Sequence, residues 1–345
     1  MYLNALETYV PASSYTQEDC WALLNKHGGL NSLNARSQSI LERILLGGAS
    51  GIGKRHFVVP DWHTLFNASA DTLQNVFECY GPQMATRAAE RALQQSGWEA
   101  DTIDALFICT CTGYLCPGLS SYVAEQLDLA KQTFLQDFVG LGCGAAIPTL
   151  RAAHNLLSRQ PDAKVVCIAV EVCSAAFYLD NDPGVLISLC LFGDGAAASL
   201  WSNTPSAGSH QASNFSTLHW PKHRDDLRFR HSGGKLKNCL AKTVPATAAR
   251  AVSNLLGQYS TDWNQTKLIC HPGGRDVLLA IESAVPEAGQ LKNSASVLHQ
   301  FGNLSSPSVL FALKEALMNV TTQKSFLLTS FGAGFSAHAM EFSWH

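Results

Sequence analysis

Residues 138–157 read FVGLGCGAAIPTLRAAHNLL, and this stretch decides the fold that the sequence predicts. A strand-like run passes through glycines directly into a helical pattern, with Cys143 at the head of the helix. Residues 301–317, FGNLSSPSVLFALKEAL, repeat the arrangement with Asn303 at the head. Pro148 and Pro307 fall in the first turns of the two helical patterns, where proline is tolerated.

The two stretches belong to a weak internal repeat of roughly 160 residues. Cys143 follows Cys109 by 34 residues, and Asn303 follows Cys270 by 33. A new strand-like run begins 22 residues after each of them, at Val165 after Cys143 and at Ser325 after Asn303. The repeat predicts two similar α/β halves related by a pseudo-twofold axis. The apolar runs that we expect to form buried strands are 105–109 (ALFIC), 165–170 (VVCIAV), 268–270 (LIC) and 326–329 (FLLT).

The expected halves are residues 1–205, which carry Cys143, and residues 216–345, which carry His271 and Asn303. A polar seam, SNTPSAGSHQASNFS at 202–216, separates them. Strands that alternate with helices favour a largely parallel sheet in each half. Elsewhere, Thr16 with Asp19 predicts a capping box, and residues 80–97 have the period of an amphipathic helix.

The composition limits the classes of partner. The chain has 345 residues, 46% of them hydrophobic and 15% charged, with a net charge of −3. The length suits one large or two ordinary domains, and the low charge predicts extensive buried surface, as in a homo-oligomer. No basic block indicates binding to nucleic acid or to an anionic membrane. The longest uncharged run, 105–124, contains Gly113 and Pro117, so it predicts a strand, a loop and a helix start rather than a membrane span.

The cysteine content favours a reducing compartment. The count is odd, at 11, and residues 1–19 have neither a basic start nor an apolar core typical of a secretory signal. We therefore expect reduced thiols and a cytoplasmic location.

Cys143 is the candidate nucleophile. A helix N-terminus stabilises negative charge, which lowers the pKa of a thiol placed there. Taken alone, Cys143 could equally be a small buried residue, His271 a structural histidine and Asn303 a helix cap. However, His271 follows an apolar strand, and ligands bind beyond the carboxyl ends of strands in open α/β sheets. Together the three residues suit thioester chemistry, with a thiolate to accept an acyl group and two donors to hold an oxyanion.

Three other interpretations use the same residues. Residues 140–145 satisfy the dinucleotide pattern G-x-G-x-x-G/A, with Glu171 as a late ribose ligand. The order Cys, His, Asn occurs in papain-like proteases, whose local signature is absent. Two sets of residues could bind a metal: Cys109, Cys111 and Cys116, and His219, His223 and His231. Neither set has a paired C-x-x-C or an H-E-x-x-H motif. We therefore interpret the first set as core cysteines and the second as part of a solvated, charge-mixed loop, and we expect no metal.

From about Tyr9 to Phe342 the chain resembles the type III polyketide synthases, the chalcone synthase-like branch of the thiolase superfamily. Several ordered motifs carry the resemblance, and together they are more specific than any one of them. They are CTCTGYLCPG (109–118), GLGCGAAIPTLRAA (140–153), EVCSAAF (171–177), LFGDGAAA (191–198), HPGG (271–274), FGNLSSPSVLF (301–311) and FGAGF (331–335).

The resemblance implies a five-layered αβαβα fold, a homodimer and no cofactor, with acyl-CoA and malonyl-CoA as substrates. It implies that Cys143 carries the starter and the growing chain. His271 and Asn303 would promote decarboxylation of malonyl-CoA, and His271 would keep Cys143 as a thiolate. Phe192 matches a gatekeeper phenylalanine between the CoA tunnel and the cavity. Four further residues of the matching motifs are expected at the substrate site. They are Gly273 and Gly274, against which the pantetheine arm would lie, and Ser305 and Gly332.

Four positions depart from the plant enzymes. Threonines that set cavity volume in the family are here Cys111, Cys173 and Ala176, and Cys116 replaces a methionine contributed by the partner subunit. Loss of a hydroxyl and a methyl at Ala176 predicts a larger, more apolar pocket and an aliphatic starter. The expected products are an alkylpyrone, a resorcinol or a related small polyketide. The alternatives are a single-condensation ketoacyl synthase III-like enzyme, and a thioester hydrolase or non-catalytic homologue.

Two further departures concern the carrier and ring closure. The basic residues that the family uses on CoA phosphates are reduced to Arg43, Lys54 and Arg55, so delivery by an acyl carrier protein is an alternative to CoA. The family loop GFGPG is here SFGAG at 330–334, without its proline, so cyclisation is expected to differ. The second gatekeeper is not assigned; Asn238 and Cys239 are near its place.

Overall fold

The computed structural model describes residues 1–59, 61–205, 209–319 and 325–344. The helices are α1 (Gln17–Lys26), α2 (Ala35–Leu45), α3 (Trp62–Phe66), α4 (Ala70–Ser96), α5 (Leu119–Gln126), α6 (Ala146–Leu157), α7 (Pro183–Leu191), α8 (Val244–Leu256), α9 (Arg275–Ala284), α10 (Lys292–Phe301) and α11 (Ser308–Met318). The strands are β1 (Tyr2–Tyr9), β2 (Ser14–Thr16), β3 (Lys54–His56), β4 (Ala105–Cys109), β5 (Phe134–Phe138), β6 (Val165–Glu171), β7 (Gly195–Ser202), β8 (His210–His219), β9 (Leu227–Ser232), β10 (Lys235–Leu240), β11 (Thr266–Cys270), β12 (Ser325–Gly332) and β13 (Ser336–Trp344).

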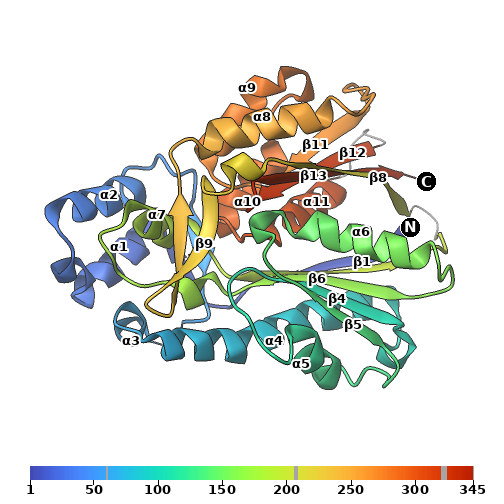
Figure 1. The fold of residues 1–345 in the computed structure, drawn as a ribbon, viewed down its shortest axis with the longest axis horizontal. Coiled ribbons are helices and arrows are strands. Elements are labelled where there is room, and N and C mark those ends of the chain that lie inside the picture. Colours follow the sequence, from blue (N-terminus) through green and yellow to red (C-terminus); the bar gives the residue numbers. More distant parts are fainter. Residues whose placement is uncertain (60, 206–208, 320–324, 345) are drawn as a thin grey trace.

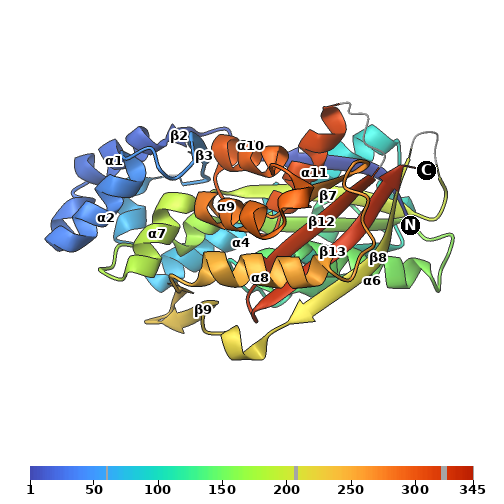
Figure 2. The same ribbon diagram turned by 90° about the horizontal axis from the view of Figure 1, so that it is seen from above.

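The elements form five layers (Figure 1). Helices α8 and α9 cover strands β11, β12, β13 and β8, and Figure 2 shows α8 lying across β12 and β13. Helices α6 and α11 form the central layer, and below it lie strands β1, β7, β6, β4 and β5 and then helices α4 and α5. The expected αβαβα order is therefore confirmed.

The strands hydrogen-bond in the order β11-β12-β13-β8-β1-β7-β6-β4-β5. Three neighbouring pairs are parallel, β4–β5, β4–β6 and β11–β12, and the other five are antiparallel. The prediction of a largely parallel sheet is therefore wrong. A short turn joins β12 to β13, and a connection of that length can only return the chain antiparallel.

The central helices confirm the sequence repeat. Helix α6 leads into β6, and α11 leads into β12. Apolar side chains of both helices pack in one core cluster with strands of both parts of the sheet, among them Ile147 and Leu150 of α6 and Val309 and Phe311 of α11. Burial of such side chains stabilises the fold by about 1.5–3 kcal/mol each.

The local helix and strand signals are confirmed with shifted limits. Thr16 and Asp19 form the capping box of α1. The helix expected at 80–97 begins ten residues earlier, where the Ser69 side chain accepts a hydrogen bond from the Thr72 amide. It ends at Gly97, whose φ of 69° favours glycine. The uncharged run 105–124 forms β4, a loop and the start of α5.

The expected seam at 202–216 is only partly a linker. Strand β7 ends at Ser202, but β8 begins at His210 and pairs with β13 and, through Gln211 and Tyr2, with β1. Residues 206–208 of the seam lie outside the described residues. The division into 1–205 and 216–345 stays a prediction.

One end of the molecule carries α1, α2, α3, α7 and the two-stranded sheet β9–β10 (Figure 1). The sequence around His219 to His231 was expected to be a solvated loop, but residues 227–232 form β9. Leu227 and Phe229 point inward and are half-buried, whereas Arg228 and Arg230 are exposed, as the alternation of a strand requires. No helix of the described residues is both long and apolar enough to cross a membrane.

Candidate active site

Backbone packing holds the turn that carries Cys143. Residues Gly142–Gly144 form a 3₁₀ turn ahead of α6, and the φ of Gly142 is 60°. A Cβ on Gly332 would lie 2.5 Å from both the Gly144 nitrogen and the Leu141 oxygen. Only glycine therefore allows the end of β12 to pack against this turn. Gly332, expected at the substrate site, lies behind the nucleophile turn.

Ser305 contacts the sulfur of Cys143. Its hydroxyl donates to Cys143 Sγ at 3.2 Å, and its backbone amide donates to Asn303 Oδ1 at 2.8 Å. Ser305 has a φ of 60°, a conformation that costs a non-glycine residue about 1–3 kcal/mol. Cys111 Sγ lies 3.2 Å from the same hydroxyl. The serine thus connects the thiol of Cys143, Asn303 and Cys111.

Burial raises the pKa of Cys143 to about 12, and the Ser305 hydrogen bond opposes this rise. The lowered thiol pKa that the sequence predicts is therefore not found in this structure. The regular helix begins only at Ala146, and the Cys143 side chain is 7% exposed, so desolvation outweighs the helix N-terminus.

His271 continues β11, because its backbone amide donates to Thr329 of β12 at 2.9 Å. The side chain is 1% exposed, and burial lowers its pKa to about 3, so the imidazole is neutral. Nδ1 has no hydrogen-bond partner among the described residues. The ring of Phe331 packs edge-on against His271 at 5.1 Å between centroids.

Asn303 is held by both its backbone and its side chain. Its amide donates to Leu191 at 2.9 Å, and its carbonyl accepts from Gly193 at 3.0 Å, which places it beside Phe192. Its side-chain Nδ2 donates to the Gly273 carbonyl at 3.1 Å. Because a carboxamide has two N–H groups, the second can donate to a ligand.

Cys143, His271 and Asn303 line one cavity, the Cys143 cavity, as their chain order and repeat positions predict. A second cavity, the side cavity, is adjacent. The Cys143 cavity is also lined by Ile187, Ser188, Leu191, Phe192, Leu227, Asn238, Leu240, Val244, Gly273, Val277 and Phe331. The side cavity is lined by Thr112, Cys173, Ala176, Phe177, Tyr178, Val185, Ser188, Phe192, Phe229, Leu236, Asn238 and Ser305.

Phe192 lines both cavities, in the place expected of a gatekeeper, and Asn238 does the same. Of the other predicted residues, Cys173, Ala176 and Ser305 line the side cavity, and Gly273 lines the Cys143 cavity. A Cβ on Gly273 would lie 3.0 Å from the Phe331 ring. Gly274 lines neither cavity, and Cys116 is exposed on this chain and also lines neither.

Glu171 is a central polar residue whose role the sequence analysis missed. It is fully buried, and burial raises the pKa of its carboxyl group. Oε2 accepts from the amides of Cys111 and Thr112 at 2.9 and 3.1 Å, and Oε1 accepts from Ser306 Oγ at 2.5 Å. The carboxylate therefore organises the loop after β4, and its occupied oxygens argue against the ribose role. An acidic residue at the end of an apolar strand was the available signal.

Arg55 has a structural role. It is 1% exposed, and its guanidinium donates to the carbonyls of Leu189 at 2.6 Å and Phe192 at 2.9 Å. These are carbonyls at the C-terminal end of α7, where a cation stabilises the free acceptors. Its assignment to the CoA phosphates is wrong, because the side chain is buried in this cap.

A layered α/β fold with a thiol, an imidazole and a carboxamide on one cavity defines a class, the thiolase-like acyltransferases. Residues 1–225 match the family model for FAE1/type III polyketide synthase-like protein, and residues 226–340 match the C-terminal domain of chalcone and stilbene synthases. The chain belongs to the type III polyketide synthase family.

The chain is also similar to individual proteins, and the solved structures among them share its fold. The chain is 28% identical to 1,3,6,8-tetrahydroxynaphthalene synthase of Streptomyces coelicolor over 86% of this chain and 81% of that protein. The crystal structure of that Streptomyces coelicolor synthase has a TM-score of 0.88 at 24% identity, covering 100% of this chain and 99% of that one. PKS-I of the brown alga Ectocarpus siliculosus has a TM-score of 0.89 at 23% identity, covering 99% and 98%.

Proposed function

We propose that this polyketide synthase extends an aliphatic acyl starter with malonyl-CoA by repeated decarboxylative condensation. The observation that carries the proposal is the arrangement of Cys143, His271 and Asn303 around one cavity that opens beside a second, apolar one. Iterative extension needs a nucleophile, an oxyanion site and space for a growing chain.

In the loading step, the Cys143 thiolate attacks the acyl-CoA carbonyl. The C–S bond to Cys143 forms as the bond to CoA breaks. The proton of Cys143 passes to Nε2 of neutral His271, and the leaving CoA thiolate takes a proton from solvent. The resulting His271 Nε2–H holds the tetrahedral oxyanion of this step. The Ser305 hydroxyl, 3.2 Å from the sulfur, stabilises the thiolate.

In the extension step, the His271 Nε2–H and the second N–H of Asn303 hold the thioester carbonyl of malonyl-CoA. The bond to the carboxylate breaks, CO₂ leaves, and the electron pair forms an enolate whose oxygen His271 and Asn303 stabilise. The enolate carbon attacks the Cys143 thioester, which forms a C–C bond and releases the thiolate. These steps need no oxidant or reductant, because the electron pair of the broken C–C bond forms the new one.

The side cavity supports an aliphatic starter. Its wall is largely apolar and includes Val185, Leu236, Phe229, Cys173 and Ala176. An alkyl chain gains about 0.8 kcal/mol for each CH₂ buried there. Membership of the type III polyketide synthase family favours repeated extension, with release of an alkylpyrone or resorcinol, over a single condensation. Similarity to the tetrahydroxynaphthalene synthases makes a polyhydroxylated naphthalene the second candidate product.

CoA is the proposed carrier. A Cβ on Gly274 would meet nothing within 4 Å, so the backbone there is open to a pantetheine arm, and Lys54 is exposed. With Arg55 buried in the α7 cap, few cations remain for the CoA phosphates, and an acyl carrier protein is the alternative.

The test is incubation of the protein with acyl-CoAs of increasing length and labelled malonyl-CoA, with product masses as the readout. Products extended several times support the proposal, one extension supports a ketoacyl synthase-like enzyme, and free acid alone supports a hydrolase. Cys143→Ala should abolish acyl loading, and a variant that is still acylated would overturn the nucleophile. Asn303→Ala should load normally but slow malonyl decarboxylation by about 100-fold.

A further inference from the structure

Asn238 is a buried polar residue at the junction of the two cavities. It lies on β10, is 4% exposed, and lines both the Cys143 cavity and the side cavity, as Phe192 does. Its neighbours on the strand, Leu236 and Leu240, are apolar lining residues. A carboxamide in such a wall needs hydrogen-bond partners, because burial of an unpaired polar group costs about 1–3 kcal/mol.

The hydrogen bonds of Ser188 fix the orientation of this carboxamide. Ser188 Oγ donates its single hydrogen to the Gly184 carbonyl at 2.7 Å. The contact between Ser188 Oγ and the Asn238 side chain, also 2.7 Å, must therefore be donated by Asn238 Nδ2. The opposite atom, Asn238 Oδ1, is buried and has no hydrogen-bond partner among the described residues. The structure thus presents an unused acceptor at the junction.

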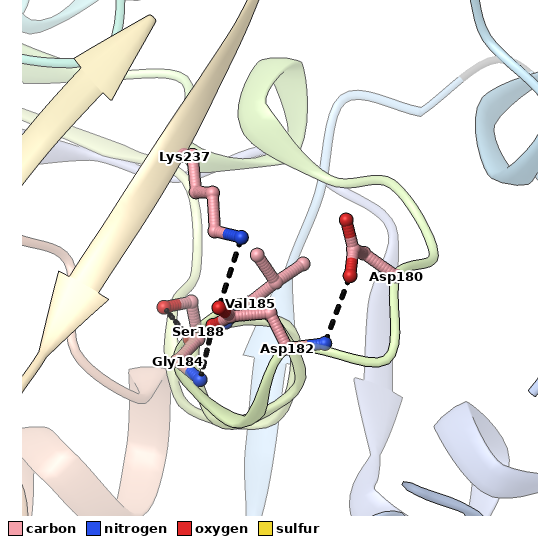
Figure 3. A network of polar contacts seen from close by, with 6 residues as sticks. All are labelled: Asp180, Asp182, Gly184, Val185, Ser188 and Lys237. Carbon is pink, nitrogen blue, oxygen red and sulfur yellow. Dashed lines mark hydrogen bonds and ion pairs between the residues drawn. The ribbon is translucent and has the colours of Figure 1, made fainter. Parts of the chain in front are cut away.

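A network of polar contacts surrounds the start of α7 and includes Ser188 and Lys237 (Figure 3). Lys237, next to Asn238, forms an ion pair with Asp182 at 2.9 Å. Asp182 caps α7 by accepting from the Gly184 amide at 2.9 Å, and its own amide donates to Asp180 at 2.9 Å. Strand β10 is therefore connected to α7 through Lys237 and through Asn238 itself, so the acceptor is preorganised.

We propose that Asn238 Oδ1 binds a hydrogen-bond donor of the substrate where the two cavities meet. The inference rests on the proposed function, because only thioester substrates would bring a donor to this point. Thioester, ketone and alkyl groups cannot donate, which leaves an N–H or O–H group. The candidates are an amide N–H of the pantetheine arm and an enol O–H of the growing chain.

Asn238→Leu tests the acceptor, since leucine has a similar volume and no polar atom. We expect kcat/KM for malonyl-CoA to fall about tenfold, the effect of one buried hydrogen bond. If pantetheine is the donor, an analogue with an ester in place of the amide nearest the thioester should be about tenfold poorer for the wild type and no poorer than the parent for the variant. If the enol is the donor, the variant should load starter normally and release shorter products.

Either pattern supports the inference, and a variant with wild-type loading, wild-type kcat/KM and wild-type products overturns it. Failure of the proposed function is distinguishable, because the wild type itself would then give no extended product. Cys239→Ala is the matched control on the same strand, since it changes a residue that lines neither cavity. Ser188→Ala frees the carboxamide to rotate and should lower kcat/KM about threefold, and thermal melting excludes unfolding in each variant.

Discussion

Cys143 and His271 are both neutral in the structure because burial acts on the two groups in opposite directions. It raises the pKa of the thiol to about 12 and lowers the pKa of the imidazole to about 3. Activation therefore requires proton transfer from sulfur to nitrogen, after which each charge stabilises the other. The pair, rather than either residue alone, makes the nucleophile.

Replacing His271 by Ala leaves burial as the largest influence on the thiol pKa. We expect iodoacetamide to alkylate Cys143 at least tenfold more slowly at pH 7 than in the wild type. The rate should rise about tenfold per pH unit above pH 7, because burial keeps the pKa of the thiol well above neutral. A variant as reactive as the wild type at pH 7 would remove His271 from thiol activation. Cys143→Ser is the control for labelling elsewhere.

Ala176 lies on the wall of the side cavity, so its size should set the preference for starter length. Ala176→Thr adds a methyl group and a hydroxyl group, and the apolar wall cannot satisfy the hydrogen bonds of the hydroxyl. We expect kcat/KM for a long acyl-CoA to fall about tenfold and kcat/KM for a short one to change less than twofold. Equal losses for both lengths would place the starter elsewhere. Competition between two acyl-CoAs in one reaction measures the ratio directly.

Residue by residue, sequence patterns identified groups whose chemistry is tied to a local motif. Cys143 follows glycines before a helix, His271 follows a strand, and Asn303 repeats the Cys143 position. Arg55 and Glu171 could not be assigned in this way, because their partners lie far along the chain. Arg55 contacts residues 134 and 137 positions away, and Glu171 contacts residues up to 135 positions away.

Among the elements, β10 and α7 form the wall around the junction, and the ion pair between Lys237 and Asp182 connects them. The pKa of Lys237 is raised, mainly by its hydrogen bond to Asp182. The two side chains are 14% and 35% exposed, so the ion pair stabilises the fold by no more than about 1 kcal/mol. Its importance should therefore lie in the position of the wall more than in global stability.

Lys237→Met and Asp182→Asn should each broaden the distribution of product chain lengths while lowering the melting temperature by only about 2–4 °C. The double variant with exchanged charges, Lys237→Asp with Asp182→Lys, should narrow the distribution again, although it loses the helix cap. Single variants with the wild-type distribution would contradict a positioning role. Arg87→Met is a control for an ion pair on the exposed face of α4.

The same elements show where sequence patterns fail. Strands 105–109 and 165–170 are continuous apolar runs and were predicted within one residue. Strand β9 alternates apolar and basic residues, and its charges made it resemble a solvated loop. Its apolar side chains face cavities, so no continuous core pattern marks it. Antiparallel pairing of β13 was missed for a related reason, since strand direction depends on connections and not on composition.

In the whole molecule, the edge strand β5 is the proposed site of homodimer formation. Strand β5 ends the sheet, and three large apolar side chains are exposed near it, Phe134 by 52%, Val139 by 50% and Tyr114 by 67%. An apolar strand edge of this kind favours pairing with a second copy. The low charged fraction of the sequence agrees with that interpretation.

Phe134→Glu should weaken the dimer about 100-fold, because a carboxylate at the interface loses its hydration. Light scattering after gel filtration should show a dimer for the wild type and a monomer for the variant at micromolar concentration. Met318→Glu, also at an exposed apolar position, is the control and should remain dimeric. A monomeric wild type would refute the proposal.

The small β9–β10 sheet, which pairs with no strand of the nine-stranded sheet, has an evolutionary consequence. Substitutions in it can reshape the wall of the cavities without disturbing the packing that fixes the nucleophile. Closely similar enzymes can therefore make different products by the same chemical step. This hairpin is the part of the chain where the redesign of such a synthase should begin.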